Sequence, residues 1–580
     1  MVPKINYRKV NFNESIFGAS NLIFKPNDKF KIKNNLFFTK DKNSLYYDEY
    51  LTYLLDSVDI IVNSNQDLIR KPLIGECRLG IDYQINKKSI IDYDLLFTDG
   101  QVESVSKRNT STGFFNENLS NKNFLIKQKL NYTNRISDKN AVIVDFNYLY
   151  NKKPQKYSLN PFYKSDIFNT YLNDSVSYNS IQNSTLKLND FALNVEYIGI
   201  SNIGNYSILA GYNYSDEALN TSLIVYNDAN EVDIGNDFVN NSLDNSQHLF
   251  IEFMNKHEKK YFKTFYGLSL NKKTISYQSS NINDNQAIYL ASKVGLGYKK
   301  DFNAASIVYS YDKKYLSLND IYVNYILTDY RTLTSGSINN ELISSHILLG
   351  NYVFSNFYRQ FLIYTNLLCI INDKAIGSQI FVDNTNTLVD KHLISGNENY
   401  IISAGVNKYI PLIYSTIKLK TDFSWYKYSN MINDFELRKN LSFSSNYKLS
   451  LKTAFNSFFN LEAKTDFIYT KFETNASSEI IDNSDVDVKM NLIFRVKDKL
   501  IMNIINETLF YNLDNCQEYY FLDFDIKYVL KKNKLSLKLI GRNLLNNTNL
   551  SRNNISDYYL RVESFGLLPR HIILVLKYRL

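Results

Sequence analysis

The residue types that usually carry enzyme chemistry are scattered along this chain of 580 residues. Its five histidines stand singly, outside any HxxxH or HExxH pattern, so no zinc site is indicated. The glycine-rich patterns that bind phosphate, GxGxxG and GxxxxGKS or GxxxxGKT, do not occur either. We therefore expect no catalytic residue, no cofactor and no metal centre, and we expect that the protein is not an enzyme.

Two pairs of aspartates have the spacing of a possible catalytic or metal-binding pair. Asp485 and Asp487, and likewise Asp523 and Asp525, lie two residues apart, which places both carboxylates of a pair on one face of a strand. A lysine follows two residues after each pair. Pairing of these opposite charges on a wet surface is the simpler interpretation, and it gives the aspartates a structural role.

One loop has the side chains needed to bind a bulky ligand. Between two predicted strands, the segment 319–336 contains Tyr322, Tyr325, Tyr330 and Arg331. Aromatic rings and a guanidinium can stack on a glycan or a peptide and donate hydrogen bonds to it. These four are the predicted substrate-binding residues. Interfacial anchoring and packing within the loop is the alternative interpretation.

The elements that would position these side chains are long, alternating strands. Apolar residues recur at every second position, with charged residues only between them, in the segments 142–150, 417–425, 461–469, 486–494 and 520–528. Such strands run to about ten residues or more, whereas those of soluble sandwiches average about 5–6. The longest apolar runs are far shorter than the roughly 18–20 residues of a transmembrane helix. The pattern predicts an all-β fold, a transmembrane antiparallel β-barrel.

The spacers between these strands are of two kinds. Short polar turns include 136–140, 299–302, 496–499 and 531–534, and long segments include 315–342, 472–484 and 546–568. In an outer-membrane barrel, short turns face the periplasm and long loops face the exterior. The alternation predicts roughly 18–22 strands, the size class that encloses a wide lumen. The identity of the segment 375–395 is ambiguous in this scheme.

The composition agrees with such a barrel. Aromatic residues make up 15% of the chain, with 47 Tyr and 37 Phe, and amphipathic rings suit a membrane–water interface. Mean hydropathy is -0.30, as expected when half of each strand faces a wet lumen. The net charge of +8 is small for this length and spread along the chain, so no nucleic-acid-binding surface is indicated. Three cysteines far apart give no disulfide framework.

The end of the chain resembles a known family of outer-membrane proteins. The sequence GRNLLNN at 541–547 is followed by a loop at 551–559, by LLPR at 567–570 and by an alternating strand at 571–580. This order resembles the end of TonB-dependent outer-membrane receptors of the Bacteroidota type, which usually finish on Phe where this chain has Leu580. The segments 21–38, 257–270 and 320–336 also look like barrel segments of that family.

The resemblance implies a barrel domain spanning residues 1–580 in the outer membrane, which imports a bulky nutrient such as an iron chelate, an oligosaccharide or a peptide. The implied partners are membrane lipid, a separately encoded plug or a surface lipoprotein, and the TonB complex once a plug is supplied; no nucleic acid is implied. Neither a signal peptide nor the family's plug is recognisable, so we expect part of a longer protein or one half of a split gene. The alternatives are a plugless passive pore or a degenerate structural remnant of a receptor, and a secreted β-rich adhesin.

Overall fold

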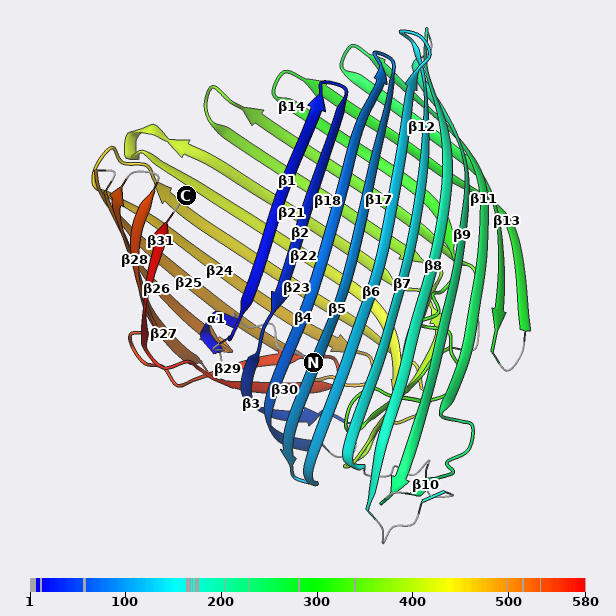
Figure 1. The fold of residues 1–580 in the computed structure, drawn as a ribbon, viewed down its shortest axis with the longest axis vertical. Helices are drawn as coiled ribbons and strands as arrows, with labels where there is room; N and C mark the ends of the chain where they lie inside the picture. The colour runs from blue at the N-terminus through cyan, green and yellow to red at the C-terminus, as the bar shows by residue number, and fades with distance from the viewer. Residues whose placement is uncertain are drawn as a thin grey trace.

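The computed structural model describes residues 7–10, 13–55, 59–162, 168, 171–172, 177–202, 204–228, 230–279, 282–337, 341–434, 436–497, 499–513, 516–531 and 534–578. The predicted all-β transmembrane barrel is confirmed, because antiparallel strands follow one another along a continuous wall that curves around a central lumen (Figure 1). No helix among these residues combines the length and the apolar composition that crossing a membrane requires.

The wall consists, among the described residues, of 23 strands, each paired with the next. In spatial order they are β1 (Ile16–Asn27), β2 (Phe30–Lys40), β4 (Ile60–Asn86), β5 (Ser89–Thr110), β6 (Gly113–Arg135), β7 (Asn140–Phe162), β8 (Tyr178–Ser201), β9 (Gly204–Asn227), β11 (Val239–Lys259), β12 (Phe262–Gln278), β13 (Ile282–Lys300), β14 (Asn303–Lys314), β17 (Ile343–Asn356), β18 (Phe361–Asn372), β21 (Glu398–Ile410), β22 (Ser415–Ile432), β23 (Arg438–Thr453), β24 (Phe459–Thr474), β25 (Ile481–Val496), β26 (Leu500–Tyr511), β27 (Gln517–Lys531), β28 (Leu535–Arg542) and β31 (His571–Tyr578). The wall therefore has one strand more than the upper limit of the predicted range.

The remaining elements are short and lie outside this wall order. They are α1 (Tyr7–Val10), β3 (Asn43–Tyr53), β10 (Asn230–Val232), β15 (Ile326–Leu327), β16 (Thr332–Ser335), β19 (Lys374–Val382), β20 (Thr387–Ser395), the 3-10 turn η2 (Pro411–Ile413), β29 (Asn549–Ile555) and β30 (Tyr559–Gly566). The segment 375–395 forms the hairpin β19–β20, which explains why its identity is ambiguous in the sequence.

The two ends of the wall differ in their connections. The predicted short turns at 136–140, 299–302, 496–499 and 531–534 all join strands at one end, where β31 also finishes. The predicted long segments 315–342, 472–484 and 546–568 contain connections at the opposite end. We call these the turn end and the loop end; in Figure 1 they lie at the top and at the bottom. The predicted alternation of short and long connections is thus confirmed.

Side chains alternate between the outside of the wall and the lumen. On β12, Tyr266, Leu268 and Leu270 are exposed on one face, and Gly267 and Ser269 lie on the other. Exposed apolar side chains continue across neighbouring strands as a band that includes Ile208, Leu249, Ile251, Ile288, Leu290 and Val294. Such a band is the lipid-facing surface of a transmembrane barrel, and the polar positions between face the lumen.

At the loop end, the long connections fold against one another and against the wall. β16 pairs with β20 in parallel, β20 pairs with β19, and the end of β19 pairs with β22. A buried apolar cluster joins the segment 315–342 to β6, β7 and β9; it includes Phe115, Leu159, Leu223, Leu327 and Leu333. We call these packed connections, together with β3, β29 and β30, the loop layer.

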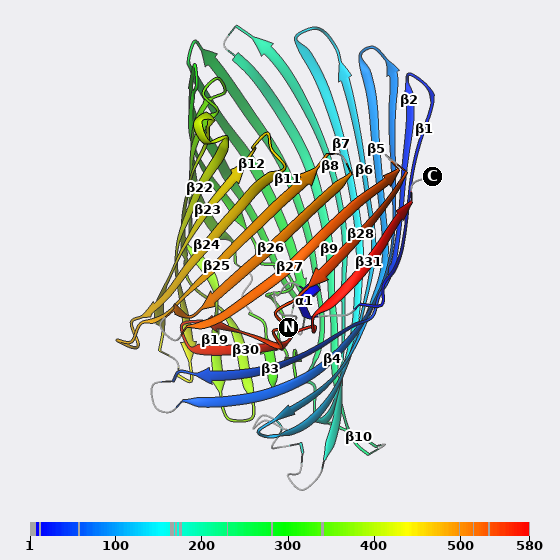
Figure 2. The ribbon, with the colours of Figure 1, turned by 90° about the vertical axis from the view of Figure 1, so that its left-hand side faces the viewer.

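The wall has two margins, formed by β1 and β31. Among the described residues, β1 pairs only with β2 and β31 pairs only with β28 (Figure 2). Both margin strands run toward the turn end. The wall contains an odd number of antiparallel strands, so the direction reverses an even number of times between β1 and β31, and these two strands point the same way. At the loop end the margins are bridged, since β3, which follows β2, pairs with β30, which precedes β31.

Candidate functional site

The structure brings the four predicted substrate-binding residues together inside the loop layer. Tyr322 and Arg331 are each only 5% exposed, and Tyr325 and Tyr330 are partly buried. The phenol of Tyr325 donates to Asp390 at 3.5 Å, which ties the segment 315–342 to β20. All four side chains therefore stabilise the packing of the loops. Their contact with a substrate stays a prediction.

Arg331 and Tyr322 join the same segment to other parts of the loop layer. The Nη2 atom of Arg331 donates to the backbone oxygens of Asp383 (2.7 Å) and Asn386 (3.2 Å) in the turn of the β19–β20 hairpin. Its guanidinium also lies 5.5 Å from the centre of the Tyr53 ring on β3. Tyr322 packs so closely against Gly336 that a Cβ there would lie 2.4 Å from the Tyr322 nitrogen. The loop thus needs glycine at position 336.

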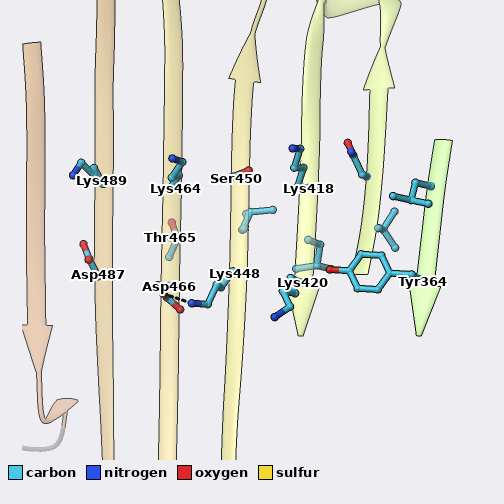
Figure 3. A pocket seen from close by; sticks show the side chains of 15 residues that line it. Tyr364, Lys418, Lys420, Lys448, Ser450, Lys464, Thr465, Asp466, Asp487 and Lys489 are labelled. Carbon is cyan, nitrogen blue, oxygen red and sulfur yellow. Dashed lines mark ion pairs between the residues drawn. The ribbon is translucent and has the colours of Figure 1, made fainter. Parts of the chain in front are cut away.

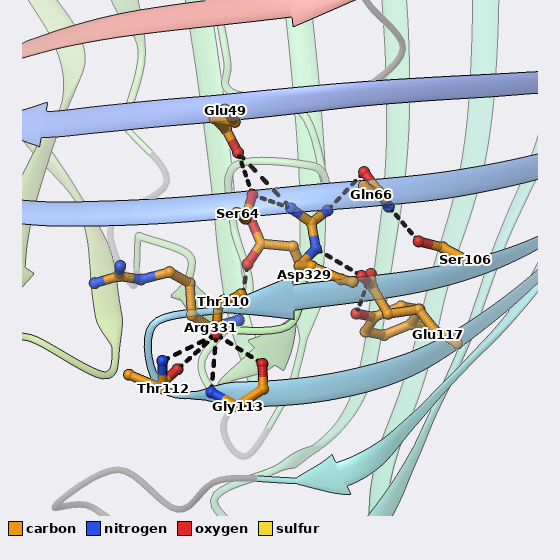
Figure 4. Close-up of polar contacts among 12 residues, drawn as sticks. Glu49, Ser64, Gln66, Ser106, Thr110, Thr112, Gly113, Glu117, Asp329 and Arg331 are labelled. Carbon is orange, nitrogen blue, oxygen red and sulfur yellow. Dashed lines mark hydrogen bonds and ion pairs between the residues drawn. The ribbon is translucent and has the colours of Figure 1, made fainter. Parts of the chain in front are cut away.

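A buried arginine on β5 anchors this layer to the wall. Arg108 is 7% exposed; its Nε donates to Glu117 at 2.7 Å, and its Nη1 and Nη2 donate to Ser64 (3.2 Å) and Gln66 (3.0 Å). Figure 4 shows Glu49, Ser64, Gln66 and Glu117 gathered around this group, with Glu49 3.7 Å away. The carboxylates of Glu117 and Glu49 beside it compensate the buried charge of Arg108.

The guanidinium of Arg108 also contacts the predicted loop. It lies 4.5 Å from the centre of the Tyr330 ring, which in turn packs 5.2 Å from the ring of Phe115 on β6. Tyr157 of β7 donates to Glu117 at 2.9 Å. Side chains of β3, β4 and β7 therefore meet around the Arg108–Glu117 pair, and the Tyr330 ring packs onto this group. Nothing in the local sequence around Arg108 signals this role, because its partners meet only through the strand order.

A second polar anchor holds the tip of the β29–β30 hairpin. Asp557 is 5% exposed and accepts hydrogen bonds from Tyr428 (2.7 Å) and Asn430 (2.8 Å) of β22. Arg438 of β23 lies 3.8 Å from the same carboxylate. The loop layer is consequently fixed on both sides of the lumen, by Arg108 and by Asp557.

Four tyrosines, two of them buried and two partly buried, make the loop layer sensitive to alkaline pH. Burial raises the pKa of Tyr47, Tyr322, Tyr325 and Tyr330 to about 12, from an ordinary value of 10.0. The folded layer therefore favours the neutral phenols, and their contribution to stability is complete below pH 10 and is lost as the pH rises through 12. A spectrophotometric titration should show a late class of tyrosines, reduced by one in Tyr330→Phe. A single ionisation step for all tyrosines would contradict this.

The predicted aspartate pairs lie on the lumen side, and the pair of Asp523 and Asp525 has structural partners on β28 and just after it. Asp525 pairs with Lys538 (3.2 Å) and Arg542 (2.8 Å) of β28, and Asp523 accepts from the backbone of Asn543 at 2.8 Å. The cations are those of the neighbouring strand rather than the lysine of the same strand. No group of three or more His, Cys, Asp or Glu side chains in the described part of the chain is arranged to hold a metal ion.

The lumen face of β22 to β25 forms a hollow with a volume of about 540 Å³. Five lysines line it, namely Lys418, Lys420, Lys448, Lys464 and Lys489, with Ser450, Asp466 and Asp487 among them (Figure 3). The lysines alternate with exposed apolar residues such as Leu419 and Leu449, which places the ammonium groups on the polar side of the wall. The hollow lies nearer the turn end than the loop layer, because Lys418 is the fourth residue of β22.

Comparison with known proteins gives only distant structural neighbours. No family model matches the chain, and no curated protein matches it in sequence. Among solved structures, the chain is similar to the copper transporter OprC, with 7% identity, a TM-score of 0.48 and coverage of 98% of this chain and 82% of OprC. It is also similar to the ferric-catecholate import receptor Fiu from E. coli K12, with 8% identity, a TM-score of 0.45 and coverage of 97% and 82%.

A third neighbour is the siderophore receptor PirA from Pseudomonas aeruginosa, with 9% identity, a TM-score of 0.42 and coverage of 98% of this chain and 81% of PirA. Because these TM-scores lie below 0.5, we base the assignment of function on the lumen, the loops and the strand order of this chain itself.

Proposed function

We propose that this chain is the barrel of an outer-membrane transporter that imports a bulky nutrient, with an iron chelate, an oligosaccharide or a peptide as the candidate classes. The observation that carries the proposal is a lumen of large circumference, lined with polar residues, whose loop-end mouth is crossed by packed connections. Barrels of this strand number hold a wide lumen that a plug fills. A polar path behind a folded entrance suits controlled passage of a large solute.

The loop layer is the proposed receptor surface. Tyr322 and Arg331 are buried within it and Tyr325 and Tyr330 are partly buried, so substrate reaches all four side chains only when the packed connections separate. The anchors at Arg108 and Asp557 lie at the edges of the layer and set how easily it opens. We propose that substrate binding competes with these loop contacts, and that a separately encoded plug and the TonB complex couple this step to energy.

A passive pore is the second candidate, and one observation favours it. Among the described residues, no compact domain of mixed helices and strands occurs apart from the wall and the loop layer. A lumen of this width without a plug passes water and ions. The two candidates differ in what a plug and an energy source do to transport.

Two measurements test the proposed function, namely ion conductance in planar bilayers and nutrient uptake by cells. In planar bilayers, the chain should conduct ions, and adding the proposed plug, for which the product of the gene immediately upstream is the candidate, should lower the conductance. In cells expressing both, uptake of the nutrient should stop when a protonophore collapses the energy supply. Uptake that is indifferent to both the plug and the protonophore would establish the passive pore and overturn the receptor assignment.

A further inference from the structure

Ser450 of β23 has a lysine at each of its four nearest positions on the lumen face. Lys418 of β22 and Lys464 of β24 lie directly opposite Ser450 in the antiparallel register. Lys448 and Lys452 stand two residues before and two residues after it on β23. Paired strands lie about 4.8 Å apart, and alternate residues of a strand about 7 Å apart. Four flexible ammonium groups can therefore meet above one hydroxyl, and we call them the lysine ring.

The lysine ring is only partly neutralised by carboxylates. Lys448 pairs with Asp466 at 3.0 Å, and Lys464 pairs with Glu462 at 3.0 Å. Lys418 forms no ion pair with a described residue, and Lys452 lies directly opposite Glu462, whose carboxylate pairs with Lys464; both lysines are exposed to the lumen. Two carboxylates thus serve four ammonium groups, and the ring keeps a net positive charge.

The register also sets like charges face to face around the ring. Lys420 lies directly opposite Lys448, and Lys464 lies directly opposite Lys489. Like charges opposite one another in adjacent strands destabilise a sheet. An anion between the ammonium groups removes this repulsion. Three lysines of the ring, Lys418, Lys448 and Lys464, line the hollow of about 540 Å³ together with Lys420 and Lys489, which leaves room for such an anion (Figure 3).

We infer that the lysine ring binds an oxyanion, a phosphate or sulfate group, carried by the transported molecule. Ammonium groups donate charge-assisted hydrogen bonds to phosphate oxygens, and the Ser450 hydroxyl supplies one further donor at the centre. The inference rests on the proposed function, because it assigns an anionic class of substrate to that transporter. Because the ring lies toward the turn end, a molecule that has passed the loop layer meets it on the way out of the lumen.

Binding of inorganic pyrophosphate to the folded, detergent-solubilised full chain at low ionic strength tests the inference. Titration calorimetry should find one pyrophosphate per chain. Lys418→Gln should weaken binding by about tenfold, because a charge-assisted hydrogen bond is lost. The matched control is Lys293→Gln on β13, which removes an exposed lumen lysine whose register partners are Gly267 and Ser310. The control should bind as the unmodified chain does.

Ser450→Asp provides an independent check, since it places a fixed carboxylate at the centre of the ring. This variant should lose pyrophosphate binding and unfold at a higher temperature than the unmodified chain. Absence of binding by the unmodified chain, or equal weakening by Lys418→Gln and Lys293→Gln, would overturn the inference. Pyrophosphate binding needs no uptake, so failure of this site and failure of the transport assignment give different results.

Discussion

Replacing Arg108 by alanine should loosen the loop layer while leaving the wall assembled. The change leaves Glu117 in a buried site where, among the described residues, only the Tyr157 hydroxyl donates to it, which costs about 3–5 kcal/mol. Trypsin should then cleave after Arg331 and Lys391 much faster than in the unmodified chain. The heat-modifiable band of the folded barrel should persist, because the backbone pairing of β5 with β4 and β6 is unchanged.

The control for this experiment is another arginine of the same wall. Arg78 is well exposed and lies 3.8 Å from Asp94, so Arg78→Ala should cost less than about 1 kcal/mol. A double variant, Arg108→Leu with Glu117→Leu, removes both charges and should restore much of the resistance to trypsin. Cleavage of Arg108→Ala at the rate of the unmodified chain would refute the anchoring role.

An arginine on the outer face of β12 should block assembly, whereas the same residue one position later should be tolerated. Leu268 is 51% exposed within the apolar band, and Leu268→Arg should cost about 2–4 kcal/mol near the bilayer midplane. Ser269 faces the lumen, where its register partner on β11 is Glu252, so Ser269→Arg gains an opposite charge. Urea unfolding in lipid vesicles measures both. Equal damage from the two variants would show that the faces are assigned wrongly.

The barrel and its two ends are predictable from the sequence because period-two alternation and spacer length are local signals. The extra wall strand is not predictable from these signals. The residues of β1, IFGASNLIFKPN, do not alternate cleanly, and all twelve are exposed, so period-two alternation does not mark them as a wall strand, although the segment 21–38 resembles a barrel segment. β4 is 27 residues long, and one of its edges pairs with two strands, with β3 along its first part and with β2 along its second part. Sequence spacing alone does not reveal such sharing.

The chemistry of the loop was visible in the sequence, but its surroundings were not. Tyr330 and Arg331 stand out as an aromatic and a cation in a long connection. Their contacts with Arg108 and Tyr53 cross more than two hundred residues and exist only because the strand order brings β3 and β5 beneath the loop. The lysine ring behaves in the same way: Lys448 and Lys452 flank Ser450 in the sequence, while Lys418 and Lys464 reach it only through register.

The two margin strands, β1 and β31, run in the same direction, and this affects how many strands the closed barrel contains. In lipid, each margin leaves a row of backbone amides and carbonyls without partners, at a cost of several kcal/mol for each group. The β3–β30 ladder is antiparallel, and prolonging it toward the turn end would lay β31 along β2. That edge of β2 is held by β1. β1 and β31 thus compete for a single edge of β2, and the strand that pairs there decides whether the closed barrel contains an odd or an even number of strands.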